Sequence, residues 1–212
     1  MSPKHLMIVG AGGFGREMWQ WASSHGDCGR AWGIRGFLDD NPEALDGLDY
    51  PCGVVGPITG HQPAPDAVYL CGLGQPKTKM LVCLPMVERG ANFVTLIHPT
   101  AIVGRNVSLG RGTVVCPGAI LTADIRIGEF VTLNCQTAVG HDATIGSWAT
   151  LSSYCNVTGR AELGQAVFMG SHAVVLPGVK VGDRAVIGAG SVAIRSVKAD
   201  QTVFGIPARV LV

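Results

Sequence analysis

Histidines are the residues of this chain best suited to proton transfer, because an imidazole titrates near neutral pH. The chain has six. Two lie at outward positions of a repeat described below, in the motifs VGHDATIG and MGSHAVV, and are the candidates for a general base: His141 and His172. The other four are expected in exposed or structural contexts near strand, helix or loop ends: His5, His25, His61 and His98.

A carboxylate directly follows the first of these candidates. Asp142 could orient the imidazole of His141 and stabilise its protonated form, as carboxylates do in other enzymes. The alternative is a polar residue that only decorates a corner of the repeat. Either way, the pair must be held by the elements around it.

Those elements are short repeats with a period of six residues. An aliphatic residue recurs at every sixth position from Ile97 to Ile187, and the series ends weakly at Ala193. A second series of small or β-branched residues runs four positions later, from Ala101 to Ala185. Glycine often follows the aliphatic residue, where we expect its backbone freedom to permit a turn. This period fits neither a helix nor an alternating strand and is typical of a hexapeptide-repeat β-helix.

Each hexad predicts one short strand and one corner, and three hexads close a triangular coil of eighteen residues. The aliphatic side chains point inward and stack into a continuous core, and each coil supports the next. No insertion breaks the register between residues 97 and 193. We therefore expect an all-β domain over residues 97–212, with a C-terminal cap.

The pattern of residues 1–96 differs from the hexad repeat and predicts a small α/β domain. The segment LMIVGAGGFGREMWQWA reads as a strand, a glycine turn and a helix. GIRGFLDD and AVYLCGLG read as further strands, residues 76–89 as a helix, and FVTLI as a fourth strand. This alternation is typical of a parallel sheet.

The glycine turn is the candidate binding motif of the first domain. Gly10, Gly12 and Gly15 match G-x-G-x-x-G between a strand and a helix, and Asp39 or Asp40 lies where a ribose-binding acid would follow. Three interpretations stay open: a nicotinamide site, a purely structural turn, or a site for a nucleotide carried by the substrate. The helix N-terminus would favour phosphates.

Composition limits the binding partners and the cellular compartment that we expect for this chain. The net charge of +1 gives no electrostatic footprint for nucleic acid, and no apolar run is long enough for a membrane span. The N-terminus lacks a cleavage pattern, so a signal peptide is not expected. The seven cysteines form no CxxC pair and predict reduced thiols in a cytoplasmic protein.

Motifs across both halves resemble one family. They are IVGAGGFGRE, GFLDD, CGLGQPKTK, LIHPTAIVG, LNCQTAVGHDATIG, VLPGVKVGDRAVIGAGSV and GIPARVL. They are similar to bacterial sugar acyltransferases of the hexapeptide superfamily, which join a Rossmann-like domain to a left-handed β-helix. The resemblance implies a homotrimer with active sites between subunits and an acyl-CoA donor, by default acetyl-CoA. It implies a nucleotide-sugar acceptor bound by residues 1–96, and no metal.

The resemblance also assigns roles to residues. His141 is the catalytic base, with Asp142 beside it. The residues implied on the CoA side are Gly159, whose amide faces the thioester, Ser171 and Ala189 along the pantetheine, and Gly205, Ile206 and Pro207 near the adenine. The residues implied on the acceptor side are Gly10, Gly12, Gly13, Phe14, Asp39, Asp40, Gly72, Asn134 and Thr150. Ordinary corner residues and a chain-terminating cap are the structural alternatives.

Two positions depart from the family pattern. Phe14 stands where the glycine loop often has a histidine, and Thr150 stands where several members have a second histidine. The preferred function is an N-acyltransferase of a nucleotide-linked amino sugar in surface glycan synthesis. The alternatives are an O-acetyltransferase of the sialic-acid type, a non-catalytic binding or assembly protein, and a metal enzyme using His98, His141 and His172. The spacings of those three histidines are not multiples of eighteen, which argues against the last.

Overall fold

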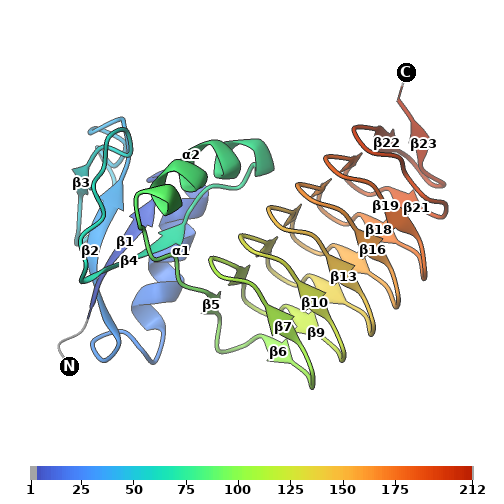
Figure 1. Ribbon diagram of the computed structural model, residues 1–212, viewed down its shortest axis with the longest axis horizontal. Coiled ribbons are helices and arrows are strands. Elements are labelled where there is room, and N and C mark those ends of the chain that lie inside the picture. Colours follow the sequence, from blue (N-terminus) through green and yellow to red (C-terminus); the bar gives the residue numbers. More distant parts are fainter. Residues whose placement is uncertain (1–3, 212) are drawn as a thin grey trace. The chain divides into compact units, whose positions relative to one another are not determined.

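A computed structural model describes residues 4–211 and divides the chain into two compact units, Met1–Val94 and Thr95–Val212 (Figure 1). Neither helix within the described residues is long and apolar enough to cross a membrane.

The first unit is a four-stranded parallel sheet with two helices. The strands are β1 (Lys4–Val9), β2 (Trp32–Leu38), β3 (Val54–Gly56) and β4 (Ala67–Cys71), and the helices are α1 (Gly13–Ser24) and α2 (Pro76–Glu88). The sheet order is β3-β2-β1-β4, with every pairing parallel. All five side chains of β4 are buried although β4 ends the sheet order, and Tyr69 on its outer edge is bridged by Phe93.

Two details differ from the sequence expectation. The strand β3 was not predicted, because three residues of an exposed edge strand carry little pattern. FVTLI does not form one strand: Phe93 makes only an isolated bridge to Tyr69, and the strand Leu96–Ile97 belongs to the second unit.

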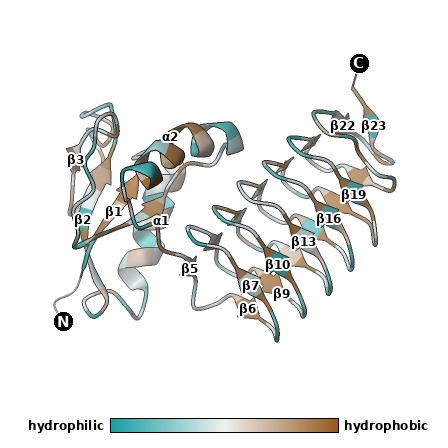
Figure 2. Cartoon of the chain, in the orientation of Figure 1, coloured by the Kyte–Doolittle hydropathy of each residue, from teal (hydrophilic) through white to brown (hydrophobic). Residues whose placement is uncertain are grey.

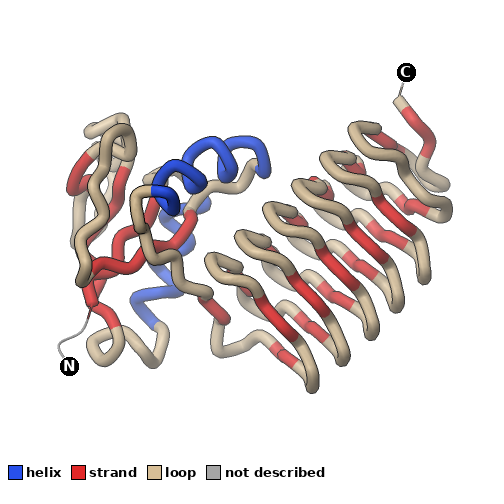
Figure 3. Tube along the Cα trace, in the orientation of Figure 1, coloured by secondary structure: helices blue, strands red, loops and turns tan. Residues whose placement is uncertain are grey.

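The second unit is a parallel β-helix built from three sheets, as the period of six predicts, and it is left-handed, as the family resemblance implies. Its strands are short and separated by turns (Figure 3). The β13 face contains β7 (Ser108–Leu109), β10 (Arg126–Ile127), β13 (Thr144–Ile145), β16 (Glu162–Leu163) and β19 (Lys180–Val181). The β12 face contains β6 (Ile102–Val103), β9 (Ile120–Leu121), β12 (Ala138–Val139), β15 (Asn156–Val157), β18 (Val174–Val175) and β21 (Val192–Ala193). The β14 face contains β5 (Leu96–Ile97), β8 (Val114–Val115), β11 (Thr132–Leu133), β14 (Thr150–Leu151), β17 (Phe168–Met169), β20 (Val186–Ile187), β22 (Thr202–Phe204) and β23 (Arg209–Val210).

Pairing between coils keeps a register of eighteen residues as far as β21, and the last coil is two residues shorter, with Val186 paired to Thr202. Thr144 pairs with Glu162, and Ile145 pairs with Leu163. The sixth-position aliphatic residues from Val115 onward are at most 5% exposed and stack into one core. The strands of the β-helix carry both hydrophobic and hydrophilic residues (Figure 2), because an outward side chain precedes each inward one: β10, for example, is Arg126–Ile127. Ile97 and Val103 are more exposed, because their strands end their sheets.

The corners depend on close approach and on left-handed backbone conformations. The glycines after the aliphatic residues are needed for a reason other than the expected turn angle. Among the described residues neither Gly110 nor Gly146 has a positive φ, but a Cβ on either would lie 2.5 Å from backbone atoms of the next coil. The positive φ values occur two positions later, at Asp142 and Trp148 for example, and mostly at residues other than glycine.

Candidate active site

The candidate base and its carboxylate form a close pair at the corner between the β12 and β13 faces, here called the His141 corner. Nδ1 of His141 lies 2.8 Å from Oδ2 of Asp142. The side chains are 59% and 54% exposed, so both are open to substrate. Because an ionised carboxylate can only accept a hydrogen bond, Nδ1 carries the proton, and the lone pair of the neutral ring lies on Nε2.

Gly159 lies directly beside this imidazole, one coil further along. A Cβ built on Gly159 would be 2.6 Å from Nε2 and 2.7 Å from Cε1 of His141. The backbone is fixed there as well, because Arg160 donates its N–H to the carbonyl of His141 at 2.8 Å. The ring therefore occupies the space that any larger residue at position 159 would fill.

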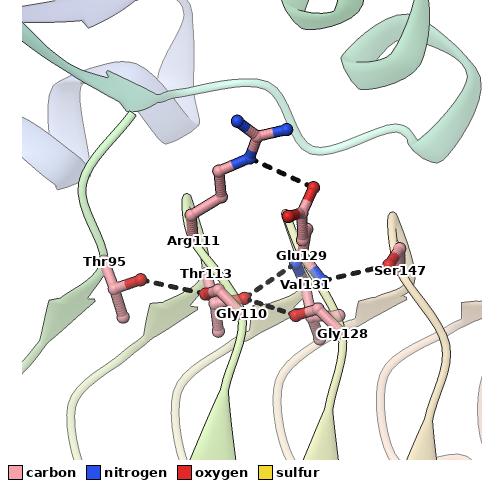
Figure 4. Close-up of polar contacts among 8 residues, drawn as sticks. All are labelled: Thr95, Gly110, Arg111, Thr113, Gly128, Glu129, Val131 and Ser147. Atoms are coloured by element: carbon pink, nitrogen blue, oxygen red, sulfur yellow. Dashed lines mark hydrogen bonds and ion pairs between the residues drawn. The ribbon is translucent and has the colours of Figure 1, made fainter. Parts of the chain in front are cut away.

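The amide of Gly159 is available to a ligand. At the same position of other hexads, the N–H groups of Glu129 and Gln165 donate to side-chain oxygens one coil further along, at 3.0 and 2.8 Å. Figure 4 shows the first of these bonds, to Ser147. The residue one coil beyond Gly159 is Pro177, which has no side-chain oxygen. Within residues 4–211 no hydrogen bond is made to the Gly159 amide.

The residues expected on the CoA side lie mostly on a different corner, between the β14 and β12 faces, here called the Tyr154 corner. Ser171 and Ala189 are exposed there, and Gly190 donates to the carbonyl of Ser171 at 2.8 Å. The turn Gly205–Pro207 reaches the same corner: Gly205 donates to Oγ of Ser191 at 2.9 Å. Ile206 in this turn is 76% exposed. Within one chain, the candidate base and these residues therefore lie at opposite edges of the β12 face.

Two residues expected on the acceptor side also lie away from His141 in the same chain. Asn134 is at the Tyr154 corner, with its Oδ1 3.8 Å from Sγ of Cys116. Thr150, on the β14 face, is only 2% exposed. Trp148 stacks on Phe130 with ring centroids 4.2 Å apart and is 7% exposed, so it offers no open aromatic face.

The glycines at and beside the glycine loop of the first unit fall into two groups. Some pack tightly against neighbouring backbone, and others face open space. A Cβ on Gly15 would be 1.9 Å from the carbonyl oxygen of Gly10, and one on Gly72 would be 2.7 Å from Cα of Gly15. These residues let α1 approach the strand ends closely. By contrast, a Cβ on Gly12 would meet no described atom within 4 Å, and one on Gly13 only Nη2 of Arg16 at 3.9 Å. The open side is where a ligand could contact the backbone.

The two acidic residues after β2 have different partners. Asp39 accepts the N–H of Ala11 in the glycine loop at 2.8 Å, so it holds the loop in place. Asp40 accepts the backbone N–H and hydroxyl of Thr59 at 2.8 and 3.0 Å, and these bonds lower the pKa of its carboxyl. Phe14 packs edge-on against Trp21, one to two turns along α1.

Arg16 is a candidate that sequence reasoning missed. Its guanidinium lies beside Gly13 in the first turn of α1, whose N-cap Gly12 makes no side-chain capping bond. Its Nε atom is buried and has no hydrogen-bond partner among the described residues. The available signal was a cation directly after G-x-G-x-x-G, beside a helix N-terminus that attracts anions.

No cluster of three or more histidine, cysteine or acidic residues in the described part of the chain could hold a metal ion. The other histidines have local partners: His98 lies 2.8 Å from the hydroxyl of Thr100, and His172 stacks on Tyr154 at 4.8 Å.

Comparisons with known proteins agree with this fold. The family described as bacterial transferase hexapeptide (six repeats) matches residues 160–194. UDP-N-acetylbacillosamine N-acetyltransferase of Bacillus subtilis (strain 168) is 30% identical over 114 residues, which are 53% of this chain and 51% of that protein. The chain thus spans about half the length of the curated relative that it matches.

Solved structures extend the likeness to both units. The acetyltransferase domain of PglB from Neisseria gonorrhoeae FA1090 is 25% identical with a TM-score of 0.89, and the match covers 98% of this chain and 100% of that domain. PerB from Caulobacter crescentus, solved with CoA and GDP-perosamine, is 24% identical with a TM-score of 0.86 and shares the fold over 98% and 97% of the two chains.

The chain is therefore related to the hexapeptide-repeat transferases, as the motifs predicted. Within that class, its similarities are to a protein named UDP-N-acetylbacillosamine N-acetyltransferase and to an acetyltransferase domain that shares the fold of both units.

Proposed function

We propose that this chain transfers an acyl group, by default acetyl, from acyl-CoA to the amino group of a nucleotide-linked amino sugar. The observation that carries the proposal is the arrangement of His141, Asp142 and Gly159, which puts a base and an available amide side by side. The curated relative is named as an enzyme of this type, and a solved relative of the same fold holds CoA and GDP-perosamine. The proposed setting is cytoplasmic surface-glycan synthesis.

His141 acts as the general base. Its Nε2 takes the proton from the acceptor nitrogen as that nitrogen attacks the thioester carbonyl, and Asp142 holds the ring through Nδ1 and stabilises the imidazolium. When the tetrahedral intermediate collapses, the C–S bond breaks and the proton passes to the departing CoA thiolate. No metal is needed in this sequence of steps.

The Gly159 amide stabilises the oxyanion. A backbone N–H that is already in place, without a protein acceptor, can bond the developing negative charge without reorganisation. The glycine also leaves room for the ring, so one residue serves both purposes.

The first unit binds the nucleotide part of the acceptor. The open backbone at Gly12 and Gly13, the N-terminus of α1 and the guanidinium of Arg16 together suit a diphosphate. The two oxygens of Asp39 already accept the N–H groups of Ala11 and Asn41, so its proposed contribution is to shape the loop, and the remaining lone pairs of the carboxylate can accept from a ribose hydroxyl.

The active form is a homotrimer. The His141 corner and the Tyr154 corner flank the same β12 face, which exposes Ile102 at 61% and Ile120 at 41%. Three copies that turn this apolar face toward a threefold axis bring the His141 corner of one subunit against the Tyr154 corner of the next. The base and the CoA-side residues Ser171 and Ala189 then come from two subunits.

The decisive experiment measures thiol release from acetyl-CoA with UDP-, GDP- and dTDP-linked 4-amino sugars, with His141→Ala as the control. Turnover with an amino sugar that the substitution abolishes, at unchanged trimer size, supports the proposal. No thiol release with any acceptor, from a protein that is still a trimer, contradicts the proposal.

An O-acyltransferase is the second candidate, and one observation favours it. The two positions that depart from the family pattern offer no polar group to an amine in one chain, since Phe14 packs on Trp21 and Thr150 is buried. The 4-hydroxy counterparts of the same sugars, with free sialic acid, test this branch. Turnover confined to the hydroxyl acceptors would establish it.

A further inference from the structure

Two thiols and an amine are buried together in the first unit, apart from the open side of the glycine loop. Cys71 is the last residue of β4, and Cys83 and Lys79 lie on the buried stripe of α2. All three are at most 2% exposed. Cys83 donates its S–H to Sγ of Cys71, with the sulfurs 3.5 Å apart. A lysine in an apolar stripe is unusual, and here the ammonium interacts electrostatically with both thiol groups.

The cluster makes one of the two thiols the more acidic. The S–H bond from Cys83, together with the nearby Lys79 ammonium, lowers the pKa of the Cys71 thiol despite its burial. The same bond raises the pKa of Cys83, so Cys71 ionises first. Thiolates are the nucleophilic form of cysteine, and a second thiol at this distance is placed to resolve an oxidised one.

We propose that Cys71 and Cys83 form a modification site at which a peroxide oxidises the pair to a disulfide. The Cys71 thiolate attacks one peroxide oxygen, the O–O bond breaks, and a sulfenic acid and a hydroxide form; the hydroxide takes up the proton that the Cys71 thiol had released and becomes water. Sγ of Cys83 then attacks the sulfenic sulfur, the S–S bond forms, and the hydroxyl leaves as a second water. The two thiols lose two electrons and the peroxide gains two.

The crosslink changes the contact between β4 and the glycine loop. The residues after Cys71 pack on that loop: Gly72 donates to the carbonyl of Val9 at 2.9 Å, and Leu73 Cδ2 lies 2.8 Å from where a Cβ on Gly10 would be. A disulfide needs its sulfurs about 2 Å apart, so Sγ of Cys71 must move toward α2. This consequence for ligand binding rests on the function proposed above, whereas the modification itself does not.

The test treats the folded, reduced full chain with hydrogen peroxide and follows it by intact mass and peptide mapping. We expect loss of two hydrogen atoms and a crosslink between the peptides of Cys71 and Cys83, reversed by dithiothreitol. In Cys83→Ser, dimedone should trap a sulfenic acid on Cys71. In Lys79→Met, oxidation of Cys71 should slow by about tenfold.

The proposal is overturned if the crosslink forms only in denaturant, or if Cys71→Ser/Cys83→Ser loses the same number of thiols as the wild type. A separate titration with UDP tests the consequence. Weaker UDP binding by the oxidised protein supports it, and equal binding by both forms overturns the consequence while leaving the modification site standing.

Discussion

The imidazole of His141 occupies the space where Gly159 would carry a side chain, with Nε2 2.6 Å from the position of a Cβ. We therefore expect Gly159→Ala to push the ring away and lower kcat by about 10²-fold, the lower range for losing a general base. The backbone N–H is retained, so the oxyanion donor stays. The check is kcat in four proteins: wild type, each single variant and Gly159→Ala/His141→Ala. If Gly159 affects the reaction by leaving room for His141, adding Gly159→Ala to His141→Ala should lower kcat little further.

The second prediction concerns the tautomer of the base. Asp142→Asn should lower kcat by about 10² to 10⁴-fold, because an amide can donate to Nδ1 and move the ring proton to Nε2. Asparagine is the suitable replacement, since position 142 has a φ of 60° and asparagine tolerates that region. Steady-state kinetics and a melting curve check it. A variant with wild-type kcat would leave the carboxylate with no part in orienting the ring.

The third prediction tests the shared site. His141→Ala removes the proposed base, and Ala189→Trp places a bulky side chain at the proposed CoA site on the other corner. Either substitution alone should therefore inactivate the trimer. In co-expressed mixtures a site that takes one corner from each neighbour has about a one-in-four chance of being intact, and activity should return to about a quarter of the wild type. No recovery in verified mixed trimers would mean that both corners act within one chain.

The fourth prediction concerns Arg16. Arg16→Gln should raise KM for the nucleotide sugar by about tenfold or more, because a charge-assisted contact to phosphate is lost. KM for acetyl-CoA should not change, and this second constant is the control for folding. Equal shifts in both constants would point to a structural role for Arg16.

The fifth prediction follows from burial of Lys79, which lowers the pKa of its amine to about 8. In the unfolded chain the amine titrates near 10.4, so between these values the unfolded state binds more protons and stability rises with pH. Relative to Lys79→Met, the free energy of unfolding of the parent should rise by on the order of 3 kcal/mol from pH 8 to 10.5. Denaturant unfolding in a Cys71→Ala/Cys83→Ala background checks this without thiol titration. Parallel curves would contradict it.

The period of six predicted the β-helix and its register because every inward position repeats the same constraint. It also predicted that His141 points outward. The left-handed corners were not predictable from composition, since residues as different as Asp142, Trp148 and Tyr154 adopt them. Stacking against neighbouring coils imposes that conformation. Likewise, the sequence could not pair Cys71 with Cys83, because packing of α2 on the sheet brings them together.

The roles assigned to the CoA-side residues stay predictions, and their distribution explains why sequence reasoning could not assemble them. A motif reports which hexad a residue belongs to. It does not report which residues meet in space, and Ser171 and His141 lie on separate corners of one chain and would meet only in the proposed trimer.

Because paired strands in neighbouring coils are eighteen residues apart, a difference in residue number reports a distance along the axis of the β-helix. Coils one repeat apart are spaced by about 4.8 Å, so counting residues measures distance along the axis. His141 and Ala189 are separated by between two and three coils, or roughly 13 Å. Deleting one whole coil between them would keep every pairing rule and shorten that span by one step. If His141 and Ala189 have the roles proposed above, the length of donor that fits between them is set in whole coils, and a shortened or lengthened β-helix should select a donor of different length.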